Sequence, residues 1–96
     1  MMKVIWKFEV PSQLSFTLDL PEGACVLSVQ MQHGKPQMWV LVDVEERPKE
    51  THAFRVQPTG VEFAMPVLGV HHFVGTFQPE PGLVFHLFRT GPDHRL

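Results

Sequence analysis

The sequence has little cysteine and no long hydrophobic run. Cys25 is the single cysteine among 96 residues, so no disulfide can form within the chain and a reducing compartment is expected. The longest apolar stretch, Phe63 to Val70, contains Pro66 and Gly69 and falls far short of the roughly 20 residues that a membrane span needs. Residues 1–10 mix charged and apolar side chains, so they lack the apolar segment of a secretory signal. These absences predict a cytoplasmic protein that does not contact a membrane.

Positive charge is also scarce. Eight Lys and Arg stand against ten Asp and Glu, the net charge is −2, and acidic residues lie among most of the basic ones. Because duplex DNA is bound through clustered cations, this balance argues against a duplex DNA partner. A small ligand that carries phosphate needs only a few cations, so this class of ligand stays open. Disorder is excluded because 44% of the residues are hydrophobic and the net charge is low.

Apolar and polar side chains alternate with a period of two along most of the chain, which is typical of half-buried strands. The clearest case is Phe16, Leu18 and Leu20, which alternate with polar residues. About seven such segments are separated by turn signals, and no segment keeps the 3.6-residue period of a helix. We predict one all-β domain over residues 1–88, a small sandwich or partly closed barrel of mostly antiparallel strands, with a C-terminal tail at residues 89–96.

The alternation also predicts which side chains face inward. In the first strand these are Val4, Trp6, Phe8 and Val10, and in the segment 24–32 they are Cys25, Leu27, Val29 and Met31. The thiol of Cys25 is therefore expected to be buried and unreactive. The segment 37–44 is apolar on both faces, so it is expected to be a central strand or to face a partner.

Sequence motifs for catalysis are missing: there is no nucleophile elbow, no His-Glu-x-x-His and no glycine-rich phosphate loop. Six histidines leave a metal site as an alternative. Neighbouring strand residues point to opposite faces, so His71 and His72 cannot both bind one ion. The remaining ligands would have to come from other segments, namely His52 or His86 with Asp43 or Glu62. Since no pair has a recognised ligand spacing, we predict no metal, no cofactor and no enzymatic activity.

Aromatic residues are more abundant than the core of a small sandwich needs. The chain has two Trp and eight Phe, and Trp39, Val84 and Phe88 fall on the expected outer side of their strands. Either the two layers of a sandwich cover these residues, or another chain does. Open sheet edges also need cover, and strand addition between identical subunits provides it. We therefore expect a homo-oligomer.

Six segments that span most of residues 3–88 occur in a characteristic order and spacing. They are Ile5-Trp6-Lys7-Phe8, Pro21-x-Gly23-Ala24-x-Val26-Leu27-Ser28-Val29-Gln30, Trp39-x-Leu41-Val42-Asp43, Phe54-Arg55-Val56-x-x-Thr59-Gly60, Val74-Gly75-Thr76-Phe77-Gln78 and Leu83-Val84-Phe85-His86-Leu87-Phe88. Together they resemble a small family of uncharacterised proteins encoded in bacteriophages and prophages. The resemblance implies a phage-linked, intracellular protein made in a bacterial host. It implies no catalytic or ligand-binding residues.

Two polar residues within these segments are not explained by turns or by a core. Arg55 and His86 project from strand faces between apolar neighbours, which favours contact with a ligand or partner. If their strands are neighbours, both side chains share a surface patch with Gln57 and Trp39. Arg89 would add a second cation for an anionic ligand. The candidate binding residues are therefore Arg55, His86, Trp39, Gln57 and Arg89.

Small size, the lack of catalytic motifs and the aromatic surface favour a non-enzymatic binding protein. With the resemblance, they predict a phage-type protein that acts in the bacterial host cytoplasm and inhibits a host defence system. It would do so by occupying a surface of a host protein or by sequestering a small anionic ligand such as a nucleotide. The alternative is a minor structural or assembly protein of a phage particle.

Overall fold

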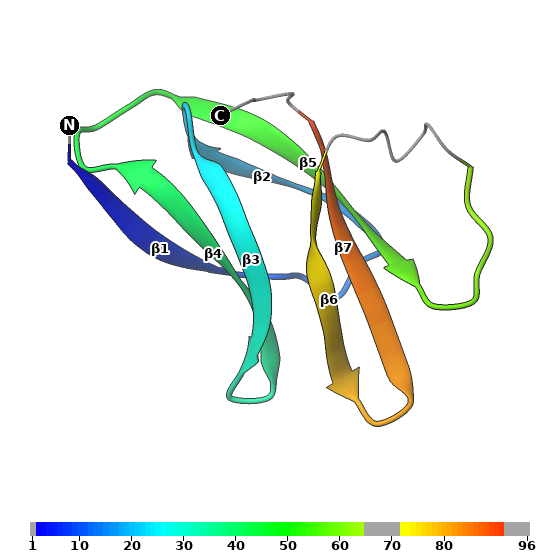
Figure 1. Ribbon diagram of the computed structural model, residues 1–96. Coiled ribbons are helices and arrows are strands. Elements are labelled where there is room, and N and C mark those ends of the chain that lie inside the picture. The colour runs from blue at the N-terminus through cyan, green and yellow to red at the C-terminus, as the bar shows by residue number, and fades with distance from the viewer. Residues whose placement is uncertain (1, 65–71, 92–96) are drawn as a thin grey trace.

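The computed structural model describes residues 2–64 and 72–91, and within them every regular element is a β-strand (Figure 1). The strands are β1 (Lys3–Glu9), β2 (Ser15–Pro21), β3 (Cys25–Gln32), β4 (Lys35–Asp43), β5 (Lys49–Pro58), β6 (Phe73–Glu80) and β7 (Leu83–Gly91). The prediction of an all-β fold with about seven strands is confirmed. None of the described residues form a helix long and apolar enough to cross a membrane.

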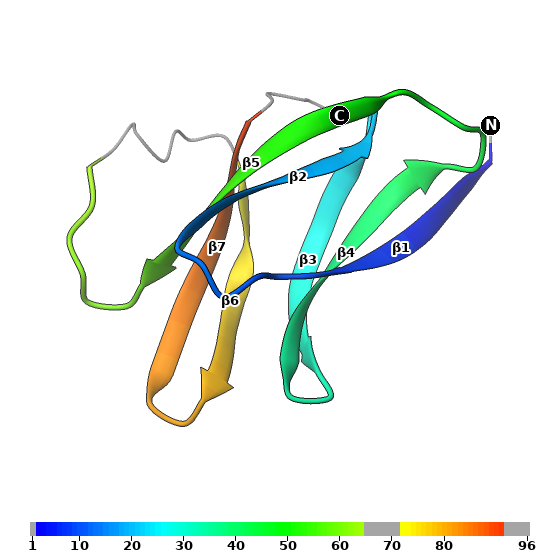
Figure 2. The same ribbon diagram turned by 180° about the vertical axis from the view of Figure 1, so that it is seen from behind.

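The strands form two antiparallel sheets that pack together, as the opposite views of Figures 1 and 2 show. One is a three-stranded sheet in the order β1-β4-β3, and the other is a four-stranded sheet in the order β2-β5-β7-β6. Strand β6 packs against β3 without pairing with it. The architecture is therefore compatible with a sandwich, and it is not a closed barrel.

The core lies between the two sheets. Its fully buried side chains include Met38 and Val40 from β4, Phe54 from β5 and Leu87 from β7. Phe54 stacks on Phe16 of β2 with ring centroids 5.0 Å apart. Large apolar side chains from both sheets thus fill the interior, and their burial is the main stabilising contribution.

A glycine allows the close approach of β6 to β3. A Cβ atom built on Gly75 would lie 2.9 Å from Val29 Cγ1, closer than carbon atoms normally come. A hydrogen bond also links the sheets nearby, because His72 Nε2 lies 3.3 Å from Val26 O and donates to it. The position of Gly75 therefore sets the spacing of the two sheets along this edge.

Strand β4 confirms the prediction of a central strand with two apolar faces. It lies between β1 and β3 in the three-stranded sheet. Met38, Val40 and Val42 are buried in the core, whereas Trp39 and Leu41 are half-buried on the outer face.

The inward residues predicted for β3 are wrong in their first half. The register with β4 shifts between Val26 and Ser28, so the chain carries one extra residue there. Such a bulge reverses the alternation. Val26 and Val29 are buried as a result, Leu27 is 44% exposed, and Cys25 is half-buried rather than buried.

Strand β1 is also more exposed than its alternation predicts. Val4 and Trp6 share a face with the buried residues of β4, yet they are 38% and 43% exposed. The reason is that β1 is the edge strand of its sheet. Among the described strands, it contacts mainly β4, and the opposite sheet covers it only slightly. Only Phe8 is half-buried within the strand.

The expected boundary of the C-terminal tail is wrong by several residues. Strand β7 continues through Gly91, and Arg89 lies within it on the inner face, opposite Phe54 and 3% exposed. Residues 89–91 therefore belong to the sheet. The rest of the expected tail, residues 92–96, lies outside the described residues, as does His71.

Candidate functional site

Three of the predicted binding residues meet on the outer face of the four-stranded sheet. Strands β5 and β7 are neighbours, with Gln57 directly opposite His86 and Arg55 directly opposite Phe88. Residues opposite each other in an antiparallel pair share a face. The face bearing Arg55, Gln57 and His86 is the outer one, because the alternate residues Val56 and Leu87 are buried in the core.

The two other predicted residues do not join this patch. Trp39 lies on the outer face of the other sheet, opposite Lys7 and Ser28. Arg89 faces the core and is nearly inaccessible to solvent. The expectation that Trp39 shares a patch with Arg55 and His86 is thus wrong, and Arg89 cannot supply a surface cation.

A pocket of about 270 Å³ lies beside His86, and we call it the His86 pocket. It is lined by Gln57, Pro58, Thr59, Gly60, Val61, Phe63, Phe73, His86 and Phe88. The phenylalanines form an aromatic wall: the ring centroid of Phe88 lies 5.3 Å from that of Phe73 and 6.3 Å from that of Phe63. Phe73 and Phe63 are 56% and 44% exposed, so the wall offers ring surface to a ligand.

His86 is held by a hydroxyl on each side of its ring. Thr59 Oγ1 lies 2.7 Å from Nε2 and donates its own proton to Val84 O at 3.0 Å. Because a carbonyl oxygen only accepts, Thr59 Oγ1 must accept from the Nε2 proton. In the neutral ring, Nδ1 then accepts the hydroxyl proton of Thr76 at 2.8 Å. Both ring nitrogens are occupied, so the imidazole is fixed and has no lone pair for a metal ion.

Gln57 is the buried polar residue of the pocket wall. It is 2% exposed, and its Nε2 donates to Val61 O at 2.9 Å, which ties the turn after β5 to the sheet. Its Oε1 is buried and has no hydrogen-bond partner among the described residues. An unsatisfied buried acceptor costs about 1–3 kcal/mol. This oxygen is enclosed as the wall stands, so a ligand donor pairs with it only after the side chain or the turn after β5 shifts.

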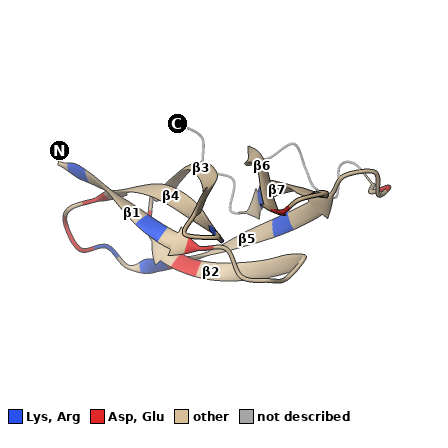
Figure 3. Ribbon diagram, turned by 90° about the horizontal axis from the view of Figure 1, so that it is seen from below, with Lys and Arg blue, Asp and Glu red and all other residues tan. Residues whose placement is uncertain are grey.

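Arg55 supplies the positive charge beside the aromatic wall. It is half-buried next to Phe88, and its Nε has no hydrogen-bond partner in the part of the chain that the structure describes. Charged residues of both signs are otherwise interspersed along the described ribbon (Figure 3). A guanidinium is planar and binds carboxylate or phosphate through two parallel hydrogen bonds. Arg55 is therefore the natural contact for an anionic group at this site.

The histidines considered as metal ligands lie apart from one another. His52 is fully buried in the core with Nε2 3.5 Å from Glu50 Oε1, and His72 donates to Val26 O. Within the described residues, no group of three or more His, Cys, Asp or Glu is placed to hold a metal ion.

Asp43, a possible metal ligand from the sequence, is an ion-pair partner instead. Its carboxylate pairs with Lys3 and accepts a 3.0 Å hydrogen bond from Arg47 Nε. The hydrogen bond from Lys3 is the largest cause that lowers the pKa of Asp43 below its usual value. Burial opposes this effect, and the hydrogen bond from Arg47 adds to the lowering. The cluster joins β1, the end of β4 and the following loop, so its role is structural.

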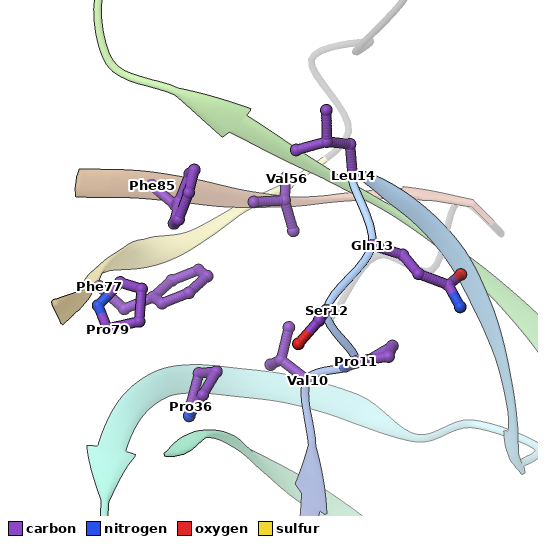
Figure 4. Close-up of a pocket in the computed structure, with 10 residues that line it drawn as sticks. All are labelled: Val10, Pro11, Ser12, Gln13, Leu14, Pro36, Val56, Phe77, Pro79 and Phe85. Carbon is purple, nitrogen blue, oxygen red and sulfur yellow. The ribbon is translucent and has the colours of Figure 1, made fainter. Parts of the chain in front are cut away.

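A second pocket of about 270 Å³ lies between the sheets at the end where β1 leads into β2 (Figure 4). We call it the inter-sheet pocket. Phe77 and Phe85 project into it from the four-stranded sheet, facing Val10 and Pro36 across the gap. The remaining lining residues are Pro11, Ser12, Gln13, Leu14, Val56 and Pro79. None of these described residues is charged, so this pocket suits an apolar group, and it offers nothing to hold an anion.

Comparison with known proteins gives a family but no described relative. The model of a family described as "Domain of unknown function (DUF7352)" matches residues 1–95. No curated protein and no solved structure matches the chain.

Proposed function

We propose that this chain, which belongs to the DUF7352 family, is a non-enzymatic binding protein that holds a small ligand in the His86 pocket. The ligand class is a planar ring that carries an anionic group, as in a nucleotide. The observation that carries the proposal is the gathering of Arg55, Gln57 and the wall of Phe63, Phe73 and Phe88 on one outer sheet face.

Each part of the ligand has a matching group in the site. A flat ring stacks on exposed aromatic side chains, whatever its substituents. A ring N–H or amino group is a donor of the kind that Gln57 Oε1 lacks. A phosphate at the border of the pocket suits the guanidinium of Arg55.

The size of the pocket agrees with a ring bound inside it and a phosphate bound outside it. Pockets for whole drug-sized ligands have volumes of about 300–1,000 Å³. A pocket of about 270 Å³ therefore holds the ring portion of a nucleotide, while the remainder lies along the sheet surface near Arg55.

The chemistry of His86 supports binding rather than catalysis. Among the described lining residues it is the one titratable side chain, and threonine hydroxyls occupy both of its ring nitrogens. A general base needs a free lone pair within reach of the substrate proton. His86 instead presents a fixed ring surface.

The resemblance to proteins of bacteriophages and prophages suggests where such a binding protein would act. In the cytoplasm of a bacterial host, capture of a nucleotide would withdraw a signal on which a defence system depends. Inhibition would then follow from occupancy alone, with no reaction.

Isothermal titration calorimetry with the four ribonucleoside monophosphates tests the proposal, with adenosine and inorganic phosphate as partial ligands. We expect at least one nucleotide to bind and the partial ligands to bind more weakly. The variant Arg55→Gln should lose about 10- to 100-fold in affinity, the value of a hydrogen bond to a charged group. Lys49→Gln, at the far end of the same strand, is the matched control and should bind normally. If no nucleotide binds, or if Arg55→Gln binds as tightly as the unchanged protein, the proposal is wrong.

A further inference from the structure

Strand β1 leaves an open hydrogen-bonding edge. Val44 N donates to Met2 O at 3.0 Å and Val10 N donates to Pro36 O at 2.9 Å, so the backbone groups of even-numbered residues point toward β4. Backbone groups alternate in direction along a strand. Those of Lys3, Glu9 and the odd-numbered residues between them therefore point away from β4, where the described chain has no pairing strand.

The core-side face of this edge is apolar, and its outer face carries Ile5 among charged residues. Val4 and Trp6 on one face are 38% and 43% exposed, and Ile5 on the other is 55% exposed. Pairing with β4 shows no register shift, so no bulge twists the strand away from a neighbour. Folded proteins normally protect such an edge. The corresponding edge strand β2 exposes no apolar side chain and ends in Pro21, which blunts it.

We propose that a second copy of this chain covers the edge, by antiparallel pairing of β1 with β1 around a two-fold axis at Trp6. This register sets Lys3 opposite Glu9 of the second copy and Ile5 opposite its Lys7. The outward-pointing residues of the two copies then face one another. They form about eight main-chain hydrogen bonds, because each such pair exchanges both.

Charge complementarity selects this register over its neighbours. Moving the axis to Ile5 places Lys3 opposite Lys7, and moving it to Lys7 places that lysine opposite its own copy. Like charges directly opposite each other are destabilising. With the axis at Trp6, the lysine and glutamate at the ends of β1 are matched. On the other face, Val4, Trp6 and Phe8 of the two copies meet.

The paired strands would join both three-stranded sheets into one continuous sheet. At the axis, Trp6 meets Trp6 in a non-hydrogen-bonded pair, where side chains approach most closely. Val4 lies opposite Phe8 on the same face. The dimer thus covers the exposed side chains of Val4 and Trp6, and it leaves the His86 pocket on the other sheet accessible.

Cross-linking tests both the interface and its register, in a background in which Cys25 is replaced by serine. Trp6→Cys brings two Cα atoms to about 4.5 Å, within disulfide range. Val4→Cys is the matched control, because two copies of Val4 are about 13 Å apart in this register. We expect oxidation to give a covalent dimer with Trp6→Cys alone. Equal cross-linking of both variants, or of neither, overturns the proposed register.

Sedimentation of the unmodified protein gives an independent test. We expect the unchanged protein to form a dimer whose share rises with protein concentration. Ile5→Pro should remain monomeric at concentrations at which the unchanged protein is dimeric. The reason is that proline removes an outward-pointing N–H donor of β1 and spares the hydrogen bonds to β4. Thr17→Pro removes an outward donor from the open edge of β2, since the even-numbered residues of that strand bond to β5, and it is the control that should leave the dimer intact. A protein that is monomeric at all concentrations, or a dimer unaffected by Ile5→Pro, contradicts the proposal. Circular dichroism of each variant verifies that it is folded.

Discussion

Replacing Gly75 by alanine should destabilise the fold, because it adds a methyl group where β6 passes β3. The new Cβ would lie 2.9 Å from Val29 Cγ1 and 3.7 Å from Val29 N. Val29 is 6% exposed and β-branched, so it has little freedom to turn away. Overpacking of this kind costs about 1–3 kcal/mol. For a domain of this size the melting temperature should fall by roughly 5–20 °C.

Thermal and urea denaturation, followed by far-ultraviolet circular dichroism, measure this change. Gly91→Ala is the matched control, since a Cβ there meets nothing within 4 Å. Val29→Ala removes the clashing methyl groups, so the two substitutions should couple: the double variant should be less destabilised than the sum of the single ones. Strict additivity, or a Gly75→Ala variant as stable as the unchanged protein, would refute the close packing of β3 and β6.

Three further predictions concern separate parts of the molecule. Asp43→Asn should lower stability at neutral pH. Because the pKa of Asp43 is depressed in the folded protein, the ionised carboxylate stabilises the fold at pH values above the ordinary pKa of an aspartate. This contribution is lost as the pH falls through the folded-state pKa. The difference between the two proteins in urea titrations should therefore vanish in acid, and a difference independent of pH would contradict it. Leu27→Ser should change the unfolding free energy by less than about 0.5 kcal/mol, whereas Val26→Ser should cost several times more; equal effects would contradict the bulge. Thr76→Val should cost about 0.5–1.5 kcal/mol and change the ¹⁵N shift of His86 Nδ1, which loses its donor; an unchanged shift would exclude this hydrogen bond.

The positions of the strands could be predicted from the alternation of apolar and polar residues, because the geometry of a strand itself points successive side chains to opposite faces. The two apolar faces of β4 were predictable for this reason. Bulges were not, since nothing in the sequence around Val26 and Leu27 distinguishes an extra residue from regular alternation. The exposure of β1 was equally hidden, because it depends on which strands the opposite sheet places above it.

The candidate site was predictable in part. Arg55 and Gln57 share a face by alternation, and His86 joined them because β5 and β7 are neighbours. The position of Trp39 on the other sheet depended on strand order, which alternation does not encode. For Arg89 a local signal existed: it continues the inward face of Leu87, which indicates a longer strand.

The partners of His86 were missed for a similar reason. Thr59 lies 27 residues before His86 and Thr76 lies 10 before it. The hairpin of β6 and β7 places the hydroxyl of Thr76 beside the ring, and the turn after β5 places that of Thr59 there. Phe63 and Phe73 likewise come together at Phe88 only once the sheet is formed. Long-range register, rather than residue type, assembles the pocket.

Chemical-shift mapping of the ¹⁵N-labelled protein during titration with a nucleoside monophosphate shows whether the His86 pocket binds a nucleotide. We expect saturable shifts of the backbone amides of residues 57–61 and 86–88, with the Arg55 side chain among the affected signals. Shifts confined to the residues around the inter-sheet pocket, or no saturable shift with any of the four nucleotides, would contradict this expectation.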